Sequence, residues 1–264
     1  MSTRSIPKPP IAVIGVGELG GVFGRALLRA GHSVHPVLRS GSIDDVAATL
    51  PAPYLALITV GETDLPHVME SFPADWRSRA GLVQNELLPR DWEQPGFTNP
   101  TVAVVWFEKK PGADVKVIIP SPIGGPQAPL LVDALAAIQI PAFVVDDRAK
   151  LEYELVRKNL YILTANIAGL VVGGTVMELW DDHRKLATAV AAEVLSIQSW
   201  LVGHPLDSGP LMDGMIDAFS ADPDHGATGR SAPGRLDRAL GFATAARIDV
   251  PTLRSISEGS TPDV

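Results

Sequence analysis

The sequence contains no cysteine among its 264 residues. Disulfide bonds, thiolate nucleophiles and zinc or iron–sulfur sites with sulfur ligands are therefore excluded. The lack of cysteine also suits a reducing compartment, and the first ten residues, MSTRSIPKPP, have no apolar core of the kind found in signal peptides. We therefore expect a cytoplasmic protein.

Positive charge is also scarce, because 22 lysines and arginines face 30 aspartates and glutamates, a net charge of -8. Nucleic acids and anionic membrane surfaces are bound by clustered lysine and arginine, so neither partner is expected.

One uncharged stretch, residues 159–177, is long enough to resemble a membrane span, but it contains two asparagines, two threonines and three glycines. Polar groups are costly in hydrocarbon, so a buried helix of a globular domain is the better interpretation.

Several catalytic signatures are missing as well. The chain has no G-x-S-x-G nucleophile elbow and no P-loop. Two groups combine aspartates with a histidine, at residues 181–183 and 222–225, but neither has the spacing of helical metal ligands. We therefore expect no metal site.

What the sequence does have, in its first half, is a regular alternation of two patterns. With 46% hydrophobic residues the chain can build a core. Apolar, β-branched runs predict strands at Ile11–Val16, Ser33–Leu38, Tyr54–Val60, Gly81–Gln84, Thr101–Phe107, Val115–Ile119 and Ala142–Val145. Amphipathic segments between several of them predict helices at Leu19–Ala30, Ile43–Leu50, Leu65–Glu70 and Gln127–Ala137. Such alternation is typical of βαβ units with a largely parallel sheet. The fifth and sixth runs, joined by KKPGAD, instead predict a hairpin, so the sheet is expected to be mixed.

The second half has only helical periodicity. We expect one long helix over residues 148–182, a second over 183–204, and shorter ones within 210–219 and 234–248. Residues 220–234 are rich in turn formers and predict an exposed loop, either a lid over a bound substrate or a surface insertion. The change of pattern places a domain boundary near residue 147, giving an α/β domain (1–147) and an all-helical domain (148–264).

The segment Gly15-Val-Gly17-Glu-Leu-Gly20 is a G-x-G-x-x-G motif that follows a predicted strand and opens a predicted helix. In that context Gly15 allows a tight turn, Gly17 lets the backbone approach a diphosphate, and Gly20 allows close helix–sheet packing. The helix N-terminus offers free N–H donors to the phosphates. The motif predicts a dinucleotide-binding, Rossmann-like domain; the alternative is a packing turn that binds nothing.

The end of the second predicted strand distinguishes the two nicotinamide dinucleotides. NAD is held there by an acidic residue on the ribose hydroxyls, whereas this strand ends in Arg39 and Ser40. A guanidinium and a hydroxyl suit a 2′-phosphate, so NADP is the expected cofactor. The alternative is that Arg39 is an ordinary solvated charge.

Taken together, these segments resemble the ketopantoate reductase (2-dehydropantoate 2-reductase) family over about residues 10–255. The resemblance rests on the glycine motif and on the segments GLVQNELL, AVVWFEKKPGADVKVIIPSPIGGP, RKNLYILTANIAGL and ARIDVPTLRSI. It implies an NADPH-dependent reductase with a Rossmann-like domain and a helical domain. It assigns the catalytic lysine to Lys158, and a residue beside nicotinamide and substrate to Asn85.

The chemistry of these residue types agrees, because a lysine ammonium can protonate the alkoxide that forms when a carbonyl accepts a hydride. On a helix, Lys158, Ile162 and Asn166 share one face, which makes Asn166 a candidate substrate ligand. The structural alternative is an ordinary lysine and a buried amide with its hydrogen bonds satisfied.

Three positions depart from the family pattern. Ile162 replaces an asparagine, Ser231 stands where an acidic residue contacts substrate, and Gly61 replaces a lysine after the third strand. An isoleucine cannot hydrogen-bond, so ketopantoate is a doubtful substrate.

We therefore expect an NADP-dependent reductase of a carbonyl compound, most simply a 2-oxo acid, with Ser231 retained as a substrate-shell residue. Two other hypotheses remain open: reduction of an imine or another small molecule in the same site, and a nucleotide sensor that has lost catalysis. Gly169-x-x-x-Gly173 allows close helix approach, either inside the domain or across a homodimer interface.

Overall fold

The computed structural model describes residues 8–260, so most of the N-terminal segment discussed above lies outside it. Contacts divide the chain into a first unit, Met1–Glu154, and a second unit, Leu155–Val264. The division falls inside one helix, α6 (Arg148–Val172), seven residues after the boundary expected from the sequence.

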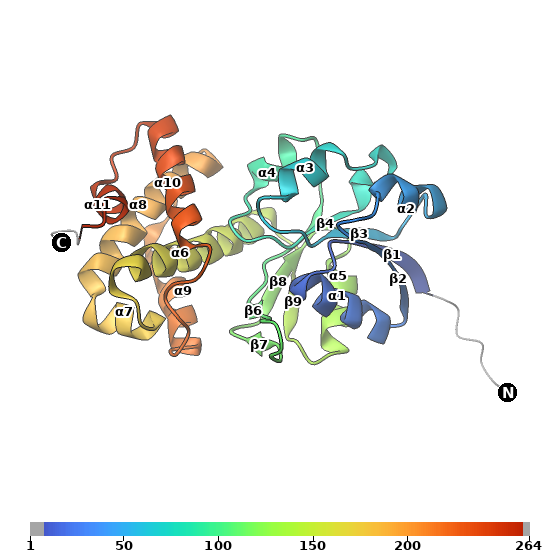
Figure 1. Cartoon of the computed structure of the whole chain (residues 1–264), viewed down its shortest axis with the longest axis horizontal. Coiled ribbons are helices and arrows are strands. Elements are labelled where there is room, and N and C mark those ends of the chain that lie inside the picture. Colours follow the sequence, from blue (N-terminus) through green and yellow to red (C-terminus); the bar gives the residue numbers. More distant parts are fainter. Residues whose placement is uncertain (1–7, 261–264) are drawn as a thin grey trace. The chain divides into compact units, whose positions relative to one another are not determined.

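The first unit is an α/β fold around a seven-stranded sheet with the order β2-β1-β3-β4-β5-β8-β9 (Figure 1). Neighbouring strands are parallel except for β5 and β8, so the sheet is mixed as predicted. The strands are β1 (Lys8–Ile14), β2 (His32–Val37), β3 (Leu55–Ile58), β4 (Ala80–Leu82), β5 (Thr101–Ala103), β8 (Ser121–Gly124) and β9 (Ala142–Val145).

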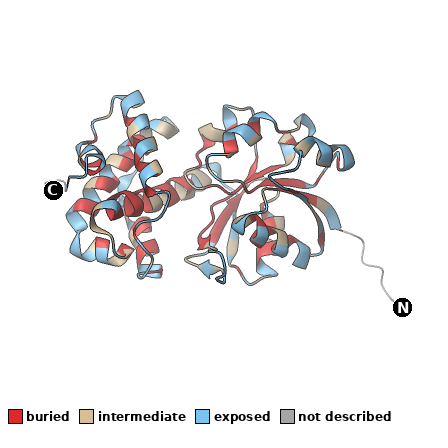
Figure 2. Ribbon diagram, in the orientation of Figure 1, coloured by how far each residue is buried: buried red, intermediate tan, exposed pale blue. Residues whose placement is uncertain are grey.

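Helices follow most of these strands, as the alternating pattern predicts. They are α1 (Glu18–Arg29), α2 (Ile43–Thr49), α3 (Leu65–Glu70), α4 (Pro89–Glu93) and α5 (Ala128–Ala136), with a 3-10 helix at Ala74–Arg79. The core contains the buried faces of α1 and α5 and the strands they cover, and Figure 2 shows the central strands buried. Burial of these apolar faces is the main source of the unit's stability.

The predicted hairpin is only partly correct. Its two strands are short, β6 (Phe107–Glu108) and β7 (Lys116–Val117), and they form a separate antiparallel sheet. The antiparallel partner of β5 in the main sheet is instead β8, which the sequence analysis missed. The sequence of this strand contains Pro122 and Gly124, and because both residue types are depleted in strands it does not show a strand pattern.

The second unit is all helical, as predicted. It contains most of α6 together with α7 (Val176–Asp182), α8 (Arg184–Val202), α9 (Ser208–Ala221), α10 (Ala232–Ala246) and α11 (Pro251–Ser257). Helices α6 and α8 are long and apolar enough to cross a membrane, but 72% and 50% of their most apolar windows are buried inside the protein. That burial is the pattern of core helices.

The prediction of one helix over residues 148–182 is wrong. Helix α6 ends at Val172, and the two glycines that follow have φ angles of 65° and 70°, in the left-handed region. The next helix, α7, begins after Thr175, whose side chain caps it. Consecutive left-handed residues end a helix, and glycine adopts that conformation at little cost.

The prediction of an exposed loop at residues 220–234 is only partly correct. Asp222 and Ala227 are buried, and the Ala227 N–H donates to the Gly174 carbonyl at 2.9 Å. The carbonyl of His225 accepts the N–H of Val176 at 2.8 Å. The segment 222–227 is therefore bonded to the α6–α7 junction, although Pro223, Asp224 and Gly226 within it are exposed, and residues 228–231 are exposed as predicted.

Candidate dinucleotide-binding site

The first unit has a cavity of about 640 Å³ at the carboxyl ends of β1, β2 and β3. The chain leaves β1 toward β2 on one side and later places β3 on the other side, so this is a point where the strand order reverses. Ligands of open α/β sheets bind at such points. Residues of the glycine motif, of the β2–α2 connection and of the β3–α3 connection line the cavity: Gly15, Gly17, Arg39, Gly41, Ser42, Thr59, Gly61 and Asp64 are among them.

Gly15 makes the sharp turn after β1. Its φ angle is +88°, and a Cβ atom there would lie 2.7 Å from Cγ1 of Val60. Its N–H donates to the Val37 carbonyl at 2.9 Å, which joins the turn to the end of β2. Both the backbone conformation and the space therefore require glycine.

Gly20 lets α1 pack tightly on the turn. A Cβ atom there would lie 2.1 Å from the Gly15 carbonyl oxygen and 2.7 Å from Oγ1 of Thr59. The Thr59 hydroxyl, at the end of β3, contacts the carbonyls of both Ile14 and Gly15, at 3.0 Å for Ile14. The sequence analysis missed Thr59; the only signal was a polar residue ending an otherwise apolar strand.

Gly17 precedes the first residue of α1 and has no side chain to cap the helix. A Cβ atom at Gly17 would meet nothing within 4 Å, and the residue is exposed. Gly17 lines the cavity, and the first N–H groups of α1, which directly follow it, lack a side-chain acceptor at the end of the helix where the dipole favours negative charge. This arrangement fits a diphosphate.

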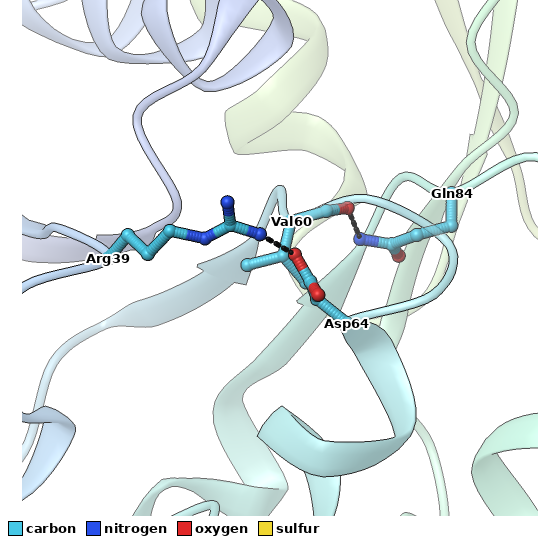
Figure 3. Close-up of polar contacts among 4 residues, drawn as sticks. All are labelled: Arg39, Val60, Asp64 and Gln84. Atoms are coloured by element: carbon cyan, nitrogen blue, oxygen red, sulfur yellow. Dashed lines mark hydrogen bonds and ion pairs between the residues drawn. The ribbon is translucent and has the colours of Figure 1, made fainter.

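Arg39 follows β2 on the rim of the cavity. Its Nη2 donates to Oδ2 of Asp64, just before α3, at 2.8 Å, and its side chain is 89% exposed (Figure 3). Exposed ion pairs are worth about 0–1 kcal/mol, so Asp64 places the guanidinium without holding it strongly. Ser40 is exposed beside it and does not line the cavity. Ser42 does line it and caps α2 through the N–H groups of residues 44 and 45.

Asn85 lies in the turn after β4 and is half-buried. The preceding residue, Gln84, donates from Nε2 to the carbonyls of Ile58 (2.9 Å) and Val60 (3.2 Å); Figure 3 shows the second bond. Gln84 thus joins the end of β4 to the end of β3 and fixes the backbone that carries Asn85. Sequence reasoning singled out Asn85 and overlooked this support.

Lys158 belongs to the second unit and is a buried residue of α6. Its Nζ lies 5.3 Å from the ring centroid of Tyr161, one turn along the helix. Tyr161 packs in turn on Phe219 and on His225, with centroid distances of 5.3 and 6.2 Å. The lysine therefore has a defined aromatic neighbour that restricts its side chain.

Asn166 serves the packing of the second unit. Its Nδ2 donates to the Ala227 carbonyl at 3.2 Å, and its Oδ1 accepts from Nη1 of Arg235 at 2.5 Å. The structure thus places Asn166 as a buried amide with internal partners, which is the structural alternative considered above. Ile162 is half-buried, and Ser231 is exposed at the start of α10.

Gly169 explains how the loop reaches α6. A Cβ atom at Gly169 would lie 2.8 Å from the carbonyl carbon of Ala227, so Gly169 allows the backbone of the loop to approach α6 closely inside the second unit.

Among residues 8–260, no group of three histidine, aspartate or glutamate side chains has the geometry of a metal site. In the second of the two aspartate–histidine groups of the sequence, His225 Nδ1 contacts Asp222 Oδ2 at 3.3 Å.

No family model and no curated protein matches the sequence. Solved structures do match, among them a ketopantoate reductase from Ralstonia eutropha JMP134, with a TM-score of 0.67 and 17% identity over 94% of this chain and 96% of its own. The chain has the ketopantoate reductase fold. A dimeric ketopantoate reductase from Staphylococcus aureus shares that fold, with a TM-score of 0.65 and 16% identity over 95% of this chain and 96% of its own.

D-mandelate dehydrogenase in complex with NADH has the ketopantoate reductase fold too. It matches with a TM-score of 0.64 and 16% identity over 94% of this chain and 96% of its own. The likeness to all three covers both units, and at these identities it concerns the fold. The resemblance drawn from the sequence is thus confirmed at that level.

Proposed function

We propose that the protein is an NADPH-dependent reductase of a carbonyl compound, most simply a 2-oxo acid. The observation that carries the proposal is the cavity at the strand-order reversal, whose lining includes Arg39 and Gly17, the residue directly before the uncapped α1 N-terminus. An anion-binding helix end and a guanidinium at the end of β2 match the diphosphate and the 2′-phosphate of NADPH.

In this proposal residues 1–147 bind the cofactor, with Arg39 and Ser40 on the 2′-phosphate, and residues 148–264 supply substrate contacts and a homodimer interface. The protein is soluble and cytoplasmic. Support for the dimer comes from the dimeric Staphylococcus aureus reductase of the same fold. Size-exclusion chromatography with light scattering tests it directly.

Lys158 is the general acid. When bound, NADPH would supply the hydride for the carbonyl carbon. The Lys158 ammonium then stabilises the negative charge on the oxygen and donates a proton to it, which yields the hydroxy acid. Asn85 orients the substrate through its amide. Asn166 supports the 222–227 segment, since both polar atoms of its amide are bonded inside the unit.

A fluorescence titration with NADPH and with NADH tests the cofactor assignment. We expect tighter binding of NADPH, and an Arg39→Ala variant that loses about tenfold or more of its NADPH affinity, because a charge-assisted bond to phosphate is lost. NADH affinity should not change. Arg29→Ala removes an exposed arginine from the far end of α1 and serves as the control. Failure of the wild type to bind either nucleotide would leave the glycine motif as a packing turn and contradict the proposal.

Imine reduction is a second candidate, favoured by the apolar Ile162 and the neutral Ser231 in the substrate shell implied by the resemblance. A less polar substrate than ketopantoate suits these side chains. A screen of 2-oxo acids with and without added amines separates the two reactions. Tight NADPH binding without turnover on either class would instead support a nucleotide sensor.

A further inference from the structure

A lysine from the β6–β7 hairpin lies against the start of α1. Lys109 follows β6, and its Nζ is 3.2 Å from Oε2 of Glu18, the first residue of α1. The two side chains are 23% and 44% exposed, so the pair is partly shielded from solvent. It joins the hairpin to the residue that directly follows Gly17 of the glycine motif.

A packed aromatic contact fixes the position of this lysine. Phe107 lies two residues before Lys109, and alternate residues of an extended segment point to the same side. Phe107 is buried and packs on Phe23 of α1 at a centroid distance of 6.0 Å. The hairpin therefore rests on α1 through two consecutive same-side residues, and Lys109 is held over the N-terminal end of the helix.

The negative charge of Glu18 at the N-terminus of α1 determines what Lys109 can contribute there. A carboxylate at the start of a helix is favourable while nothing else occupies the positive end of the dipole. A diphosphate bound at the same helix end would be repelled by that carboxylate unless a cation stood between or beside them. Lys109 is the cation that the structure places there.

The ammonium has a free donor for a ligand. Lysine has three N–H groups. In the described part of the chain, one points to Glu18 and one to the backbone carbonyl of Lys110, at 2.8 Å. The third is bonded to no residue between 8 and 260, so a phosphate oxygen can accept it without breaking the other two contacts.

We propose that Lys109 is a ligand of the cofactor diphosphate, held in place by Glu18. The inference rests on the proposed function, because it requires a dinucleotide at the glycine motif. Glu18 orients the lysine, and the lysine offsets the negative charge that Glu18 brings to the site. The sequence G-x-G-E-x-G therefore works as a phosphate loop together with a lysine about ninety residues away in the chain.

The two nucleotides distinguish Lys109 from Arg39. NADPH and NADH share the diphosphate, so Lys109→Ala should weaken both by a similar factor of about tenfold or more. Arg39→Ala should weaken NADPH alone. Lys110→Ala is the matched control, since Lys110 is an exposed neighbour that pairs with Glu108. Thermal unfolding of each variant checks that the hairpin still folds.

Neutralising Glu18 provides a second test of the role of Lys109. In the Lys109→Ala background Glu18 is left uncompensated, so adding Glu18→Gln should recover part of the lost affinity for both nucleotides. Wild-type-like binding by Lys109→Ala, or a loss confined to NADPH, would overturn the role of Lys109 and leave the proposed function standing. A wild type that binds neither nucleotide would overturn both.

Discussion

Lys158 is the residue on which the proposed chemistry depends. Lys158→Ala should lower kcat by about a hundredfold or more, the range of general acid–base catalysis, while the affinity for NADPH stays unchanged because the proposed nucleotide site belongs to the first unit. Steady-state kinetics with the best substrate of the screen, together with the NADPH titration, measures both quantities.

Lys150→Ala is the control for this variant, because Lys150 is an exposed lysine on the same helix. It should leave kcat unchanged. A Lys158→Ala enzyme that turns over at the wild-type rate would remove Lys158 from the mechanism.

Two neighbouring glycines of α1 should respond in opposite directions to the same substitution. At Gly20 a Cβ atom would clash with the Gly15 carbonyl, whereas at Gly21 it would meet nothing within 4 Å. Gly20→Ala should lower the free energy of unfolding by about 1–3 kcal/mol and weaken NADPH binding, since the turn must move. Gly21→Ala should raise the free energy of unfolding by about 0.5–1 kcal/mol, because alanine favours a helix. Urea unfolding measures both changes. Equal changes in the free energy of unfolding would contradict the close packing of Gly20 on the Gly15 carbonyl.

At the scale of single residues, the sequence predicted those whose role follows from local spacing. Gly15, Gly17 and Gly20 occupy the expected turn because the strand–turn–helix pattern dictates it. Thr59 and Lys109 were missed, since their contacts join segments dozens of residues apart. Helical periodicity placed Asn166 on a shared face but could not show that the 222–227 segment and Arg235 would take up its hydrogen bonds.

At the scale of elements, the junction of α6 and α7 offers a clear test. The Thr175 hydroxyl accepts the N–H of Glu178 at 3.2 Å, and the Thr175 N–H donates to Oε2 of Glu178 at 2.8 Å. Thr175→Ala should cost about 1 kcal/mol of unfolding free energy because the first turn of α7 loses its cap. Thr175→Ser keeps the hydroxyl and should restore most of it. Unfolding that is identical in all three proteins would mean that the cap contributes nothing.

Elements with strong periodicity were predicted well, and those defined by tertiary partners were not. Helix α1 and strands β1 to β3 appear near their predicted positions because burial imposes their patterns. Strand β8 forms despite its proline because Val104 donates to the Pro122 carbonyl at 2.9 Å and the strand has β9 on its other side. The long helix was overextended because apolar residues continue through Gly173 and Gly174, where backbone conformation overrides the pattern.

At the scale of the whole molecule, the change from alternating to helical periodicity indicated an α/β region followed by a helical one, and the fold comparisons confirm that class. Helix α6 begins in the first unit, where Oδ1 of Asp147 accepts the N–H groups of Ala149 and Lys150. These bonds lower the pKa of Asp147, which keeps the capping carboxylate charged. Most of the helix then belongs to the second unit, so α6 connects the first unit to the segment that carries Lys158.

Ligand-linked unfolding tests whether the cofactor belongs to the first unit. Trp76, Trp92 and Trp106 lie in that unit, so a Trp180→Phe/Trp200→Phe variant reports on it alone. A ligand at about a hundred times its Kd stabilises the state it binds by about 2.7 kcal/mol. Urea unfolding followed by tryptophan fluorescence should therefore shift to a higher midpoint with NADP⁺, and the shift should shrink when Arg39→Ala is added. A midpoint that stays constant at saturating NADP⁺ would place the nucleotide elsewhere, because binding to the folded first unit must stabilise it.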